Sequence, residues 1–152
     1  MINKPIFPRF PLFITLDGMP VLVAGGGKIA ARRISVLKEF GASITIVSPE
    51  ICESLREIIE HINWMPECYR GIDSDYTLVI AATNDRIVNR QVGVDAASLG
   101  IPVSVADSRE ESTFWFPGIE RRGEIIVGVV SVNGNHTAVK TATNAVRKAL
   151  KL

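Results

Sequence analysis

Residues 21–30 read Val21-Leu22-Val23-Ala24-Gly25-Gly26-Gly27-Lys28-Ile29-Ala30, and this stretch decides the fold of the chain. Its apolar first half is short enough for a buried strand, and the three glycines predict a tight turn directly after it. Residues 28–40 follow with helical spacing of their apolar positions, and Gly41 is a typical helix end. The stretch therefore predicts a strand, a glycine turn and a helix in immediate succession.

The glycine turn matches a phosphate-binding pattern. Gly25, Gly27 and Ala30 satisfy G-x-G-x-x-A, in which the first glycine permits the turn and the second lets a pyrophosphate approach the backbone. The alanine lets the helix pack closely on the strand. The first helical amides, around Gly27, Lys28 and Ile29, lack intrahelical partners and lie at the positive end of the helix dipole. We expect a dinucleotide here; a turn that binds nothing is the alternative.

The rest of the chain repeats this alternation. Apolar runs predict further strands, and amphipathic stretches predict helices between them; the strands are expected at 44–47, 62–69, 76–82 and 101–106, the helices at 49–61 and 84–99. Such alternation predicts an α/β fold with a Rossmann-like, doubly wound parallel sheet. A strand at 124–132 and a helix at 137–150 form a small appendage. We expect an NAD-binding Rossmann domain over 1–112 and a dimerisation segment over 113–152, because so small an appendage needs a second copy or the main domain to bury its core.

Composition argues against several classes of partner. The net charge is +1 and 47% of the residues are hydrophobic, so no nucleic-acid partner is expected. No apolar stretch reaches the roughly 20 residues that span a bilayer, and no signal-peptide pattern opens the chain, so we expect a cytoplasmic protein without a membrane partner. Cys52 and Cys68 form no C-x-x-C pair and have no histidine at ligand spacing, which predicts reduced thiols and no metal site.

The end of the second strand bears on the choice of dinucleotide. An acidic residue there would hydrogen-bond the adenosine ribose of NAD, whereas this chain has Ser48, Pro49 and Glu50. No arginine cluster suited to a 2′-phosphate lies within 48–54, so NAD is favoured over NADP. Glu50 has two interpretations, a contact to the ribose or a first-turn acid favoured by the next helix's dipole.

An acidic side chain follows the fifth strand. In sheets of this kind ligands bind beyond the carboxyl ends of the strands, where the strand order reverses. That rule predicts that the turn at 25–30 and the strand end at Ala82 and Thr83 face one crevice, with Asp107 just past the neighbouring strand. A carboxylate there could accept a proton from a substrate whose hydride goes to the nicotinamide. A loop aspartate that caps local amides is the alternative.

Several ordered blocks together resemble one family. They are Phe-Pro-Leu-Phe at 10–13, Val-Ala-Gly-Gly-Gly-Lys-Ile-Ala-Ala-Arg-Arg at 23–33, Gly-Ala-Ser-Ile-Thr-Ile-Val-Ser-Pro at 41–49, Ala-Ala-Thr-Asn-Asp at 81–85, Asp107 followed by 112–117, and Val-Ser-x-x-Gly at 130–134. The chain resembles the siroheme synthase N-terminal family, the bifunctional precorrin-2 dehydrogenases and sirohydrochlorin ferrochelatases.

The resemblance implies NAD-dependent oxidation of precorrin-2 to sirohydrochlorin in sirohaem biosynthesis, together with iron insertion into the product. The family's essential aspartate matches Asp107, and its NAD contacts match 28–29 and 49–50. Its tetrapyrrole carries many carboxylates, which would give basic side chains in the tetrapyrrole-facing C-terminal segment a purpose; these are Arg121, Arg122, Lys140 and Arg147.

Two other functions stay open. The family usually opens its last helix with Ser-Pro, whereas residues 133–138 read Asn-Gly-Asn-His-Thr-Ala, so a non-catalytic homologue that binds NAD or a tetrapyrrole is one alternative. A regulatory nucleotide-sensing Rossmann module is the other. Such modules generally have an acid at the end of the second strand, where this chain has Ser48, and they do not need Asp107.

Overall fold

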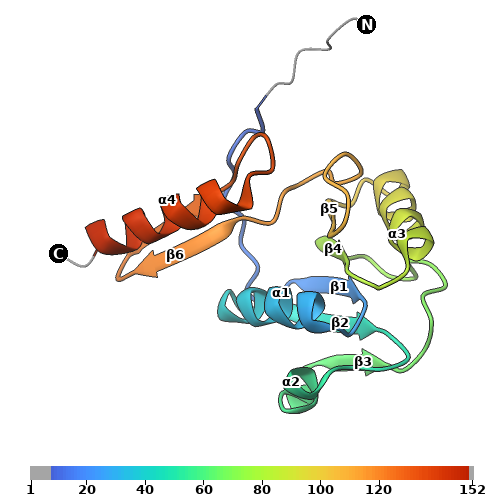
Figure 1. The fold of residues 1–152 in the computed structure, drawn as a ribbon. Helices are drawn as coiled ribbons and strands as arrows, with labels where there is room; N and C mark the ends of the chain where they lie inside the picture. Colours follow the sequence, from blue (N-terminus) through green and yellow to red (C-terminus); the bar gives the residue numbers. More distant parts are fainter. Residues whose placement is uncertain (1–7, 151–152) are drawn as a thin grey trace, which may run out of the picture. The chain divides into compact units, whose positions relative to one another are not determined.

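The computed structural model describes residues 8–150, and within them the chain forms two compact units (Figure 1). One unit comprises Ile14–Phe114. The other joins residues 8–13 to residues 115–150 within the described part of the chain. In this second unit the Arg9 guanidinium lies 5.0 Å from the centre of the Trp115 ring. This cation–π contact connects the two sequence segments that form the unit. Residues 1–7 and 151–152 of the domains expected from sequence lie outside the described part.

The Ile14–Phe114 unit is built on a five-stranded parallel sheet. Its strands are β1 Pro20–Ala24, β2 Ser43–Val47, β3 Asn63–Met65, β4 Leu78–Ala81 and β5 Val103–Val105, in the order β3-β2-β1-β4-β5. The order reverses between β1 and β4, so their carboxyl ends flank the switch point at which such sheets bind ligands. The predicted Rossmann-like sheet is confirmed.

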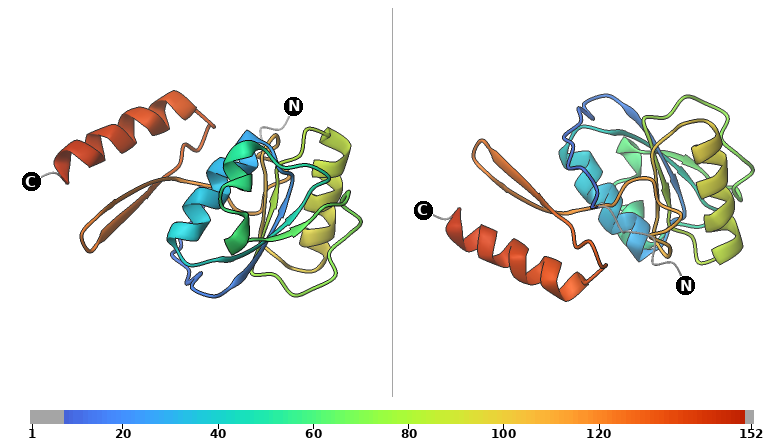
Figure 2. Two further views of the ribbon diagram at one scale, coloured as in Figure 1. Left: turned by 90° about the horizontal axis from the view of Figure 1, so that it is seen from below. Right: turned by 90° about the horizontal axis from the view of Figure 1, so that it is seen from above.

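Helices cover both faces of this sheet (Figure 2). α1, Lys28–Glu39, buries Ala30, Ile34 and Leu37, and α3, Arg86–Ser98, lies on the opposite face. Successive strand residues point to opposite faces, so the α3 side of the core takes alternate positions of the strands. That core comprises Leu22, Ala24, Val47, Val79, Ala81, Val103 and Val105, packed with Val92 and Ala96 of α3.

The prediction of a single helix over 49–61 is wrong. The segment instead holds a short helix, α2 Glu53–Arg56, and a 3₁₀ turn, η1 Ile59–His61. Residues 49–52 stay outside any helix because they cross the glycine turn, where the Cys52 amide donates to the Gly26 carbonyl over 2.8 Å. A helix beginning at Pro49 would forfeit that contact.

The regular secondary structure described in the second unit is a hairpin and one helix. β6 Gly118–Arg122 pairs antiparallel with β7 Ile125–Val129, and α4 His136–Ala149 packs on the hairpin. The Asn135 side chain caps α4 by accepting from the Ala138 amide over 2.9 Å. No residue of α4 is buried. Among the described residues, no helix is long and apolar enough to cross a membrane.

Candidate dinucleotide site and neighbouring acid

The glycine turn brings the ends of three strands together. The Gly25 amide donates to the Val47 carbonyl over 3.0 Å, and the Ala82 amide donates to the Ala24 carbonyl over 2.8 Å. Gly25 has φ +116°, and a Cβ on it would lie 2.2 Å from the Ala82 carbonyl oxygen. A side chain is therefore excluded both by the backbone conformation and by the neighbouring strand end.

The next two glycines have different surroundings. A Cβ on Gly26 would lie 2.2 Å from the Glu50 carbonyl oxygen, so this residue lets the segment after β2 cross the turn. Around Gly27 a Cβ would meet nothing within 4 Å, and its φ of −85° is open to any residue. The space over Gly27 is therefore where a ligand's phosphates can approach the backbone.

The start of α1 offers amide donors at this open space. Gly27 occupies the N-cap position and provides no side-chain cap. The first amides of a helix have no intrahelical acceptor, so those of Lys28, Ile29 and Ala30 are available to an anion at the positive end of the dipole. The Lys28 and Ile29 side chains are exposed, whereas Ala30 is buried against the sheet. Ala30 thus has the close-packing position that the sequence motif predicts.

The segment after β2 is held by its own polar groups. The Ser48 hydroxyl donates to the Glu50 carbonyl over 2.6 Å, and the Trp64 indole N–H donates to the Ser48 carbonyl over 2.9 Å. Ser48 is 8% exposed, whereas Glu50 is exposed. Glu50 also lies before α2, so the interpretation of it as a first-turn acid of the next helix does not hold. Its carboxylate is the acidic group at the end of β2.

These segments line one cleft of about 630 Å³. Most of the residues that the sequence assigned to the dinucleotide meet there: Gly25, Gly27, Ser48, Pro49, Glu50, Ala82 and Thr83. Lys28, Ile29 and Ala30 follow directly in α1. Sequence reasoning did not assign the cleft's other lining residues, which include Gly26, Cys52, Cys68, Tyr69 and Asp85.

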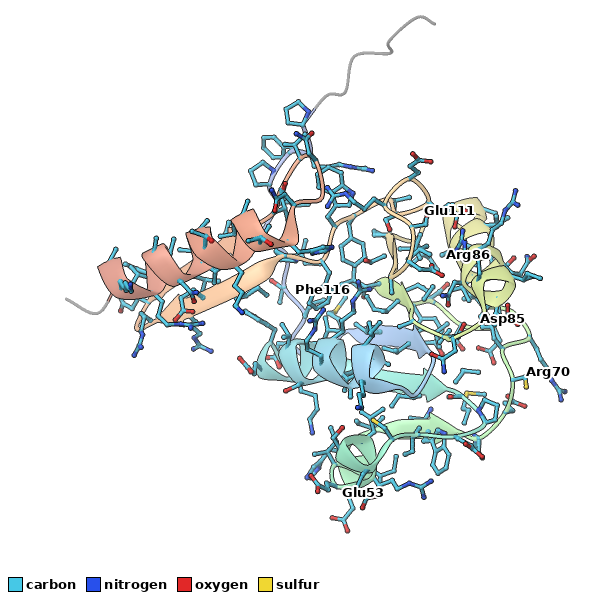
Figure 3. The ribbon with its side chains drawn as sticks, viewed as in Figure 1. Glu53, Arg70, Asp85, Arg86, Glu111 and Phe116 are labelled. Atoms are coloured by element: carbon cyan, nitrogen blue, oxygen red, sulfur yellow. The ribbon has the colours of Figure 1, made fainter. Side chains whose placement is uncertain are left out.

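Asp107 lies just beyond β5, with a partner on each carboxylate oxygen. Arg86 Nη1 donates to Oδ1 over 3.0 Å, and Asn89 Nδ2 donates to Oδ2 over 3.1 Å. The second Arg86 nitrogen, Nη2, pairs with Glu111 (Figure 3). The hydrogen bond that Arg86 donates to Glu111, together with the charges of both carboxylates, raises the pKa of Arg86, so this guanidinium stays charged. The Asp107 side chain is 40% exposed and accessible to a substrate.

Asn89 connects this acid to the cleft. Its side-chain oxygen accepts from the Thr83 amide over 2.9 Å and from the Thr83 hydroxyl over 2.7 Å, while Nδ2 also donates to the Thr83 carbonyl over 3.1 Å. One buried amide therefore holds both Thr83, which lines the cleft, and Asp107. Sequence reasoning missed Asn89, although an asparagine in line with the buried Val92 and Ala96 of α3 was a usable signal.

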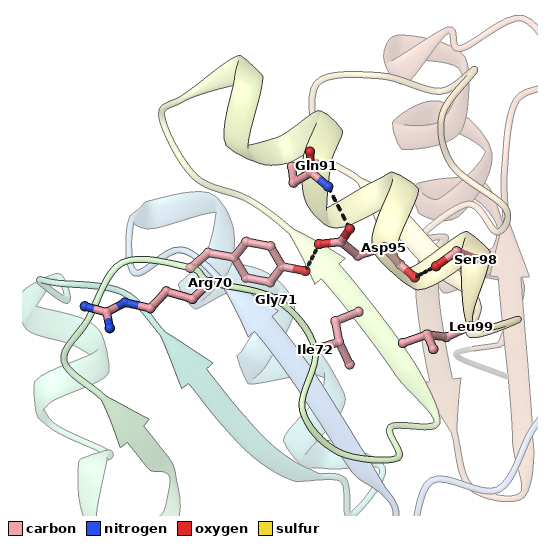
Figure 4. Close-up of a pocket in the computed structure, with 8 residues that line it drawn as sticks. Arg70, Gly71, Ile72, Gln91, Asp95, Ser98 and Leu99 are labelled. Carbon is pink, nitrogen blue, oxygen red and sulfur yellow. Dashed lines mark hydrogen bonds between the residues drawn. The ribbon is translucent and has the colours of Figure 1, made fainter.

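A second hollow, of about 580 Å³, lies along α3 and is not at the glycine turn. There the Tyr69 hydroxyl and the Gln91 side chain each donate to Asp95 over 2.7 Å (Figure 4). Burial first, and then the hydrogen bond to Asp95 and its charge, raise the pKa of the Tyr69 phenol. Tyr69 also lines the dinucleotide cleft, so it contacts both hollows.

The basic residues proposed for substrate carboxylates all lie in the second unit. Arg147 Nε donates to Glu120 over 2.9 Å, and Arg122 Nε lies 3.9 Å from the other oxygen of Glu120, which is 8% exposed. Arg121 and Lys140 are exposed. Arg147 thus has a structural role as the partner of a buried carboxylate. Among the described residues, no three His, Cys, Asp or Glu side chains gather as metal ligands.

A parallel sheet of order 3-2-1-4-5, with a glycine turn and a helix N-terminus at the switch point, defines a Rossmann-like dinucleotide-binding protein. Residues 12–118 match the family described as "Putative NAD(P)-binding". The chain belongs to this family, the N-terminal family of the siroheme synthases.

Individual relatives agree with this assignment. The chain is 46% identical over 150 residues to the "Probable multifunctional siroheme biosynthesis protein HemA" of Ruminiclostridium josui, covering 96% of this chain and 29% of that protein. It is 37% identical to the siroheme synthase of Psychrobacter sp. (strain PRwf-1), over 90% of this chain and 28% of that protein. The chain thus spans under a third of the length of these relatives.

A solved structure shares the fold. "SirC, precorrin-2 dehydrogenase" superposes with a TM-score of 0.78 over 93% of this chain and 71% of that chain, with 24% identity. This similarity concerns the fold alone.

Proposed function

We propose that this chain oxidises precorrin-2 to sirohydrochlorin with NAD⁺ as the hydride acceptor. The observation that carries the proposal is the Thr83–Asn89–Asp107 connection, which fixes an accessible carboxylate one amide away from the dinucleotide cleft. The names of the relatives, siroheme synthase and a siroheme biosynthesis protein, supply the substrate class.

The reaction removes one hydride and one proton from the tetrapyrrole. NAD⁺, when bound, supplies the acceptor for the hydride. Asp107 receives the proton at a carboxylate oxygen and later releases it to water. The cleft residues would hold the dinucleotide: the Gly27 backbone and the start of α1 would bind its phosphates, and Glu50 would bind its adenosine ribose.

NAD is the preferred dinucleotide in this proposal. The exposed Glu50 carboxylate can accept hydrogen bonds from ribose hydroxyls and would repel the 2′-phosphate of NADP. The Ser48 hydroxyl is already engaged with the Glu50 carbonyl, so it supports the loop and leaves recognition to the carboxylate.

The proposal is tested by following NADH and sirohydrochlorin together, with precorrin-2 generated in situ. One NADH is expected per sirohydrochlorin formed. Tight NAD binding without any NADH formation would instead support the non-catalytic homologue or the nucleotide-sensing module. Iron insertion is measured separately, by adding Fe²⁺ to sirohydrochlorin in the absence of NAD⁺.

We also propose that the second unit mediates a homodimer. α4 buries none of its residues, and Ile125 is 52% exposed, Val130 42% and Val132 43%. Exposed apolar side chains on a unit this small favour contact with a second copy. Light scattering should give twice the chain mass, and a monomer at all concentrations would reject the dimer. The cytoplasmic location stays a prediction.

A further inference from the structure

We infer that Asn89 is the residue that positions Asp107, holding its Oδ2 so that Oδ1 is the oxygen that receives the substrate proton. This inference rests on the proposed function, because it assigns a task within that reaction. Two observations carry it: the saturated hydrogen bonding of the Asn89 amide, and the contrast between the partners of the two Asp107 oxygens.

The orientation of the Asn89 amide is determined by its neighbours. The Thr83 backbone amide can only donate, so the oxygen of Asn89 must face it, at 2.9 Å. The nitrogen then faces two acceptors, the Thr83 carbonyl and Asp107 Oδ2, each at 3.1 Å. The Thr83 hydroxyl lies 2.7 Å from the Asn89 oxygen and 3.0 Å from the Asp85 carbonyl oxygen; with its single proton on the shorter contact, both donors and both acceptor sites of the Asn89 amide are occupied.

Burial makes this arrangement rigid. Asn89 is 1% exposed, and it belongs to α3, whose neighbouring core residues Val92 and Ala96 are each 0% exposed. A buried amide that lost one of these partners would have no water to replace it, so the four bonds support one another. Asp107 Oδ2 is therefore held at a defined place relative to Thr83 and the cleft.

The other oxygen of Asp107 has a partner of a different kind. Arg86 Nη1 donates to Oδ1, but the Arg86 side chain is 45% exposed and its other nitrogen pairs with Glu111. A long, solvent-exposed guanidinium with an alternative carboxylate can leave Oδ1 at little cost. Of the two oxygens, Oδ1 is thus the one that a substrate can reach without breaking a buried network.

The Asn89→Asp substitution tests the hydrogen bond between Asn89 and Asp107. It keeps the oxygen that accepts from Thr83, but it replaces the nitrogen that donates to Asp107 and to the Thr83 carbonyl with an acceptor. The paired carboxylates repel each other, so we expect the urea midpoint to fall. Adding Asp107→Asn reverses the direction of this hydrogen bond and should recover part of the lost stability, whereas the Thr83 carbonyl stays without its donor in both variants. No recovery in the double variant would overturn the contact, whether or not the protein has any dehydrogenase activity.

Kinetics then test the positioning role. Asn89→Asp and Asn89→Ala are each expected to lower kcat by about 10- to 100-fold, with a smaller change in KM for NAD⁺, because Thr83 keeps its own hydrogen bonds with Asp85. The double variant should stay at least as slow as Asp107→Asn, because its carboxylate is at position 89 and not at position 107. Gln91→Ala is the matched control, since it removes an amide from the same helix outside the site and should leave kcat unchanged. Wild-type kcat in Asn89→Ala would overturn the inference while leaving the proposed function intact; no turnover in the wild type would instead reject the proposed function.

Discussion

Gly25 and Ala82 approach so closely that a Cβ on the glycine would lie 2.2 Å from the alanine carbonyl oxygen. This contact joins the ends of β1 and β4, the two strands between which the sheet order reverses. The floor of the dinucleotide cleft therefore depends on a residue without a side chain. Gly25 is needed for the fold itself, before any ligand binds.

Gly25→Ala should destabilise the protein by at least about 3 kcal/mol, because strain at positive φ is added to a backbone clash. Gly18→Ala is the matched control. Gly18 also has a positive φ, +69°, but a Cβ there would meet nothing within 4 Å. Gly18→Ala should therefore lower the free energy of unfolding by the backbone strain alone, about 1–2 kcal/mol. Urea unfolding measures both, and equal losses would show that the clash with Ala82 is relieved by other shifts.

Gly27→Ala should give a folded protein that binds NAD⁺ poorly. Its φ of −85° suits alanine and its Cβ would enter open space, so the unfolding midpoint should stay close to that of the wild type. The same methyl would occupy the place where phosphates approach the backbone. Calorimetric titration should show NAD⁺ affinity reduced by at least about 10-fold. Undiminished affinity would place the phosphates elsewhere.

Glu50→Gln should narrow the preference for NAD⁺ over NADP⁺. The substitution removes the charge that repels a 2′-phosphate and weakens the acceptor for ribose hydroxyls. We expect the affinity ratio of the two dinucleotides to change by about 10-fold, equivalent to about 1.4 kcal/mol. Glu53→Gln, a neighbouring exposed acid at the start of α2, should leave the ratio unaltered. Equal effects of the two variants would mean that net charge alone sets the ratio.

Much of this architecture is predictable from the sequence. Buried parallel strands are apolar runs such as Leu78–Ala81, and the glycine turn indicates the first βα unit. The segment after β2 is not predictable in this way. Its helical pattern is overridden by the contact between Cys52 and Gly26, which exists only once β1 and β2 are paired. The role of Asn89 is also not predictable from the sequence, because it depends on hydrogen bonds to two residues, Thr83 and Asp107, that follow different strands.

Tyr69 predicts a pH dependence at the alkaline end. Its pKa is raised in the folded protein, chiefly by burial, above the ordinary value of 10.0. The phenol therefore loses its proton at a lower pH in the unfolded chain than in the folded protein. Its contribution to the free energy of unfolding is fully present below pH 10 and declines as the pH rises above 10. In Tyr76→Phe, Tyr69 is the only tyrosine of the sequence. In the folded variant, the midpoint of the increase in phenolate absorbance should therefore lie at a pH well above 10. A midpoint at 10 would contradict the burial of this phenol.

Arg147 should matter for stability. Among residues 8–150, Arg147→Met leaves Glu120, which is 8% exposed, with Arg122 at 3.9 Å as its remaining ion-pair partner. A loss of about 1–3 kcal/mol is expected for a buried acceptor that loses its main donor. Lys140→Met, an exposed site on the same helix, should be near neutral. If instead both variants keep full stability and both raise KM for precorrin-2, the role of Arg147 is substrate binding.

We propose that Asp107 accepts a proton beside a bound dinucleotide. The most direct measurement is the rate of NADH formation from precorrin-2 at saturating NAD⁺ in Asp107→Asn, alongside its dissociation constant for NADH. We predict a rate lower by about 10²- to 10⁴-fold, with NADH affinity within about 3-fold of the wild type, because the amide preserves shape but is not basic. A wild-type rate in this variant would contradict the claim.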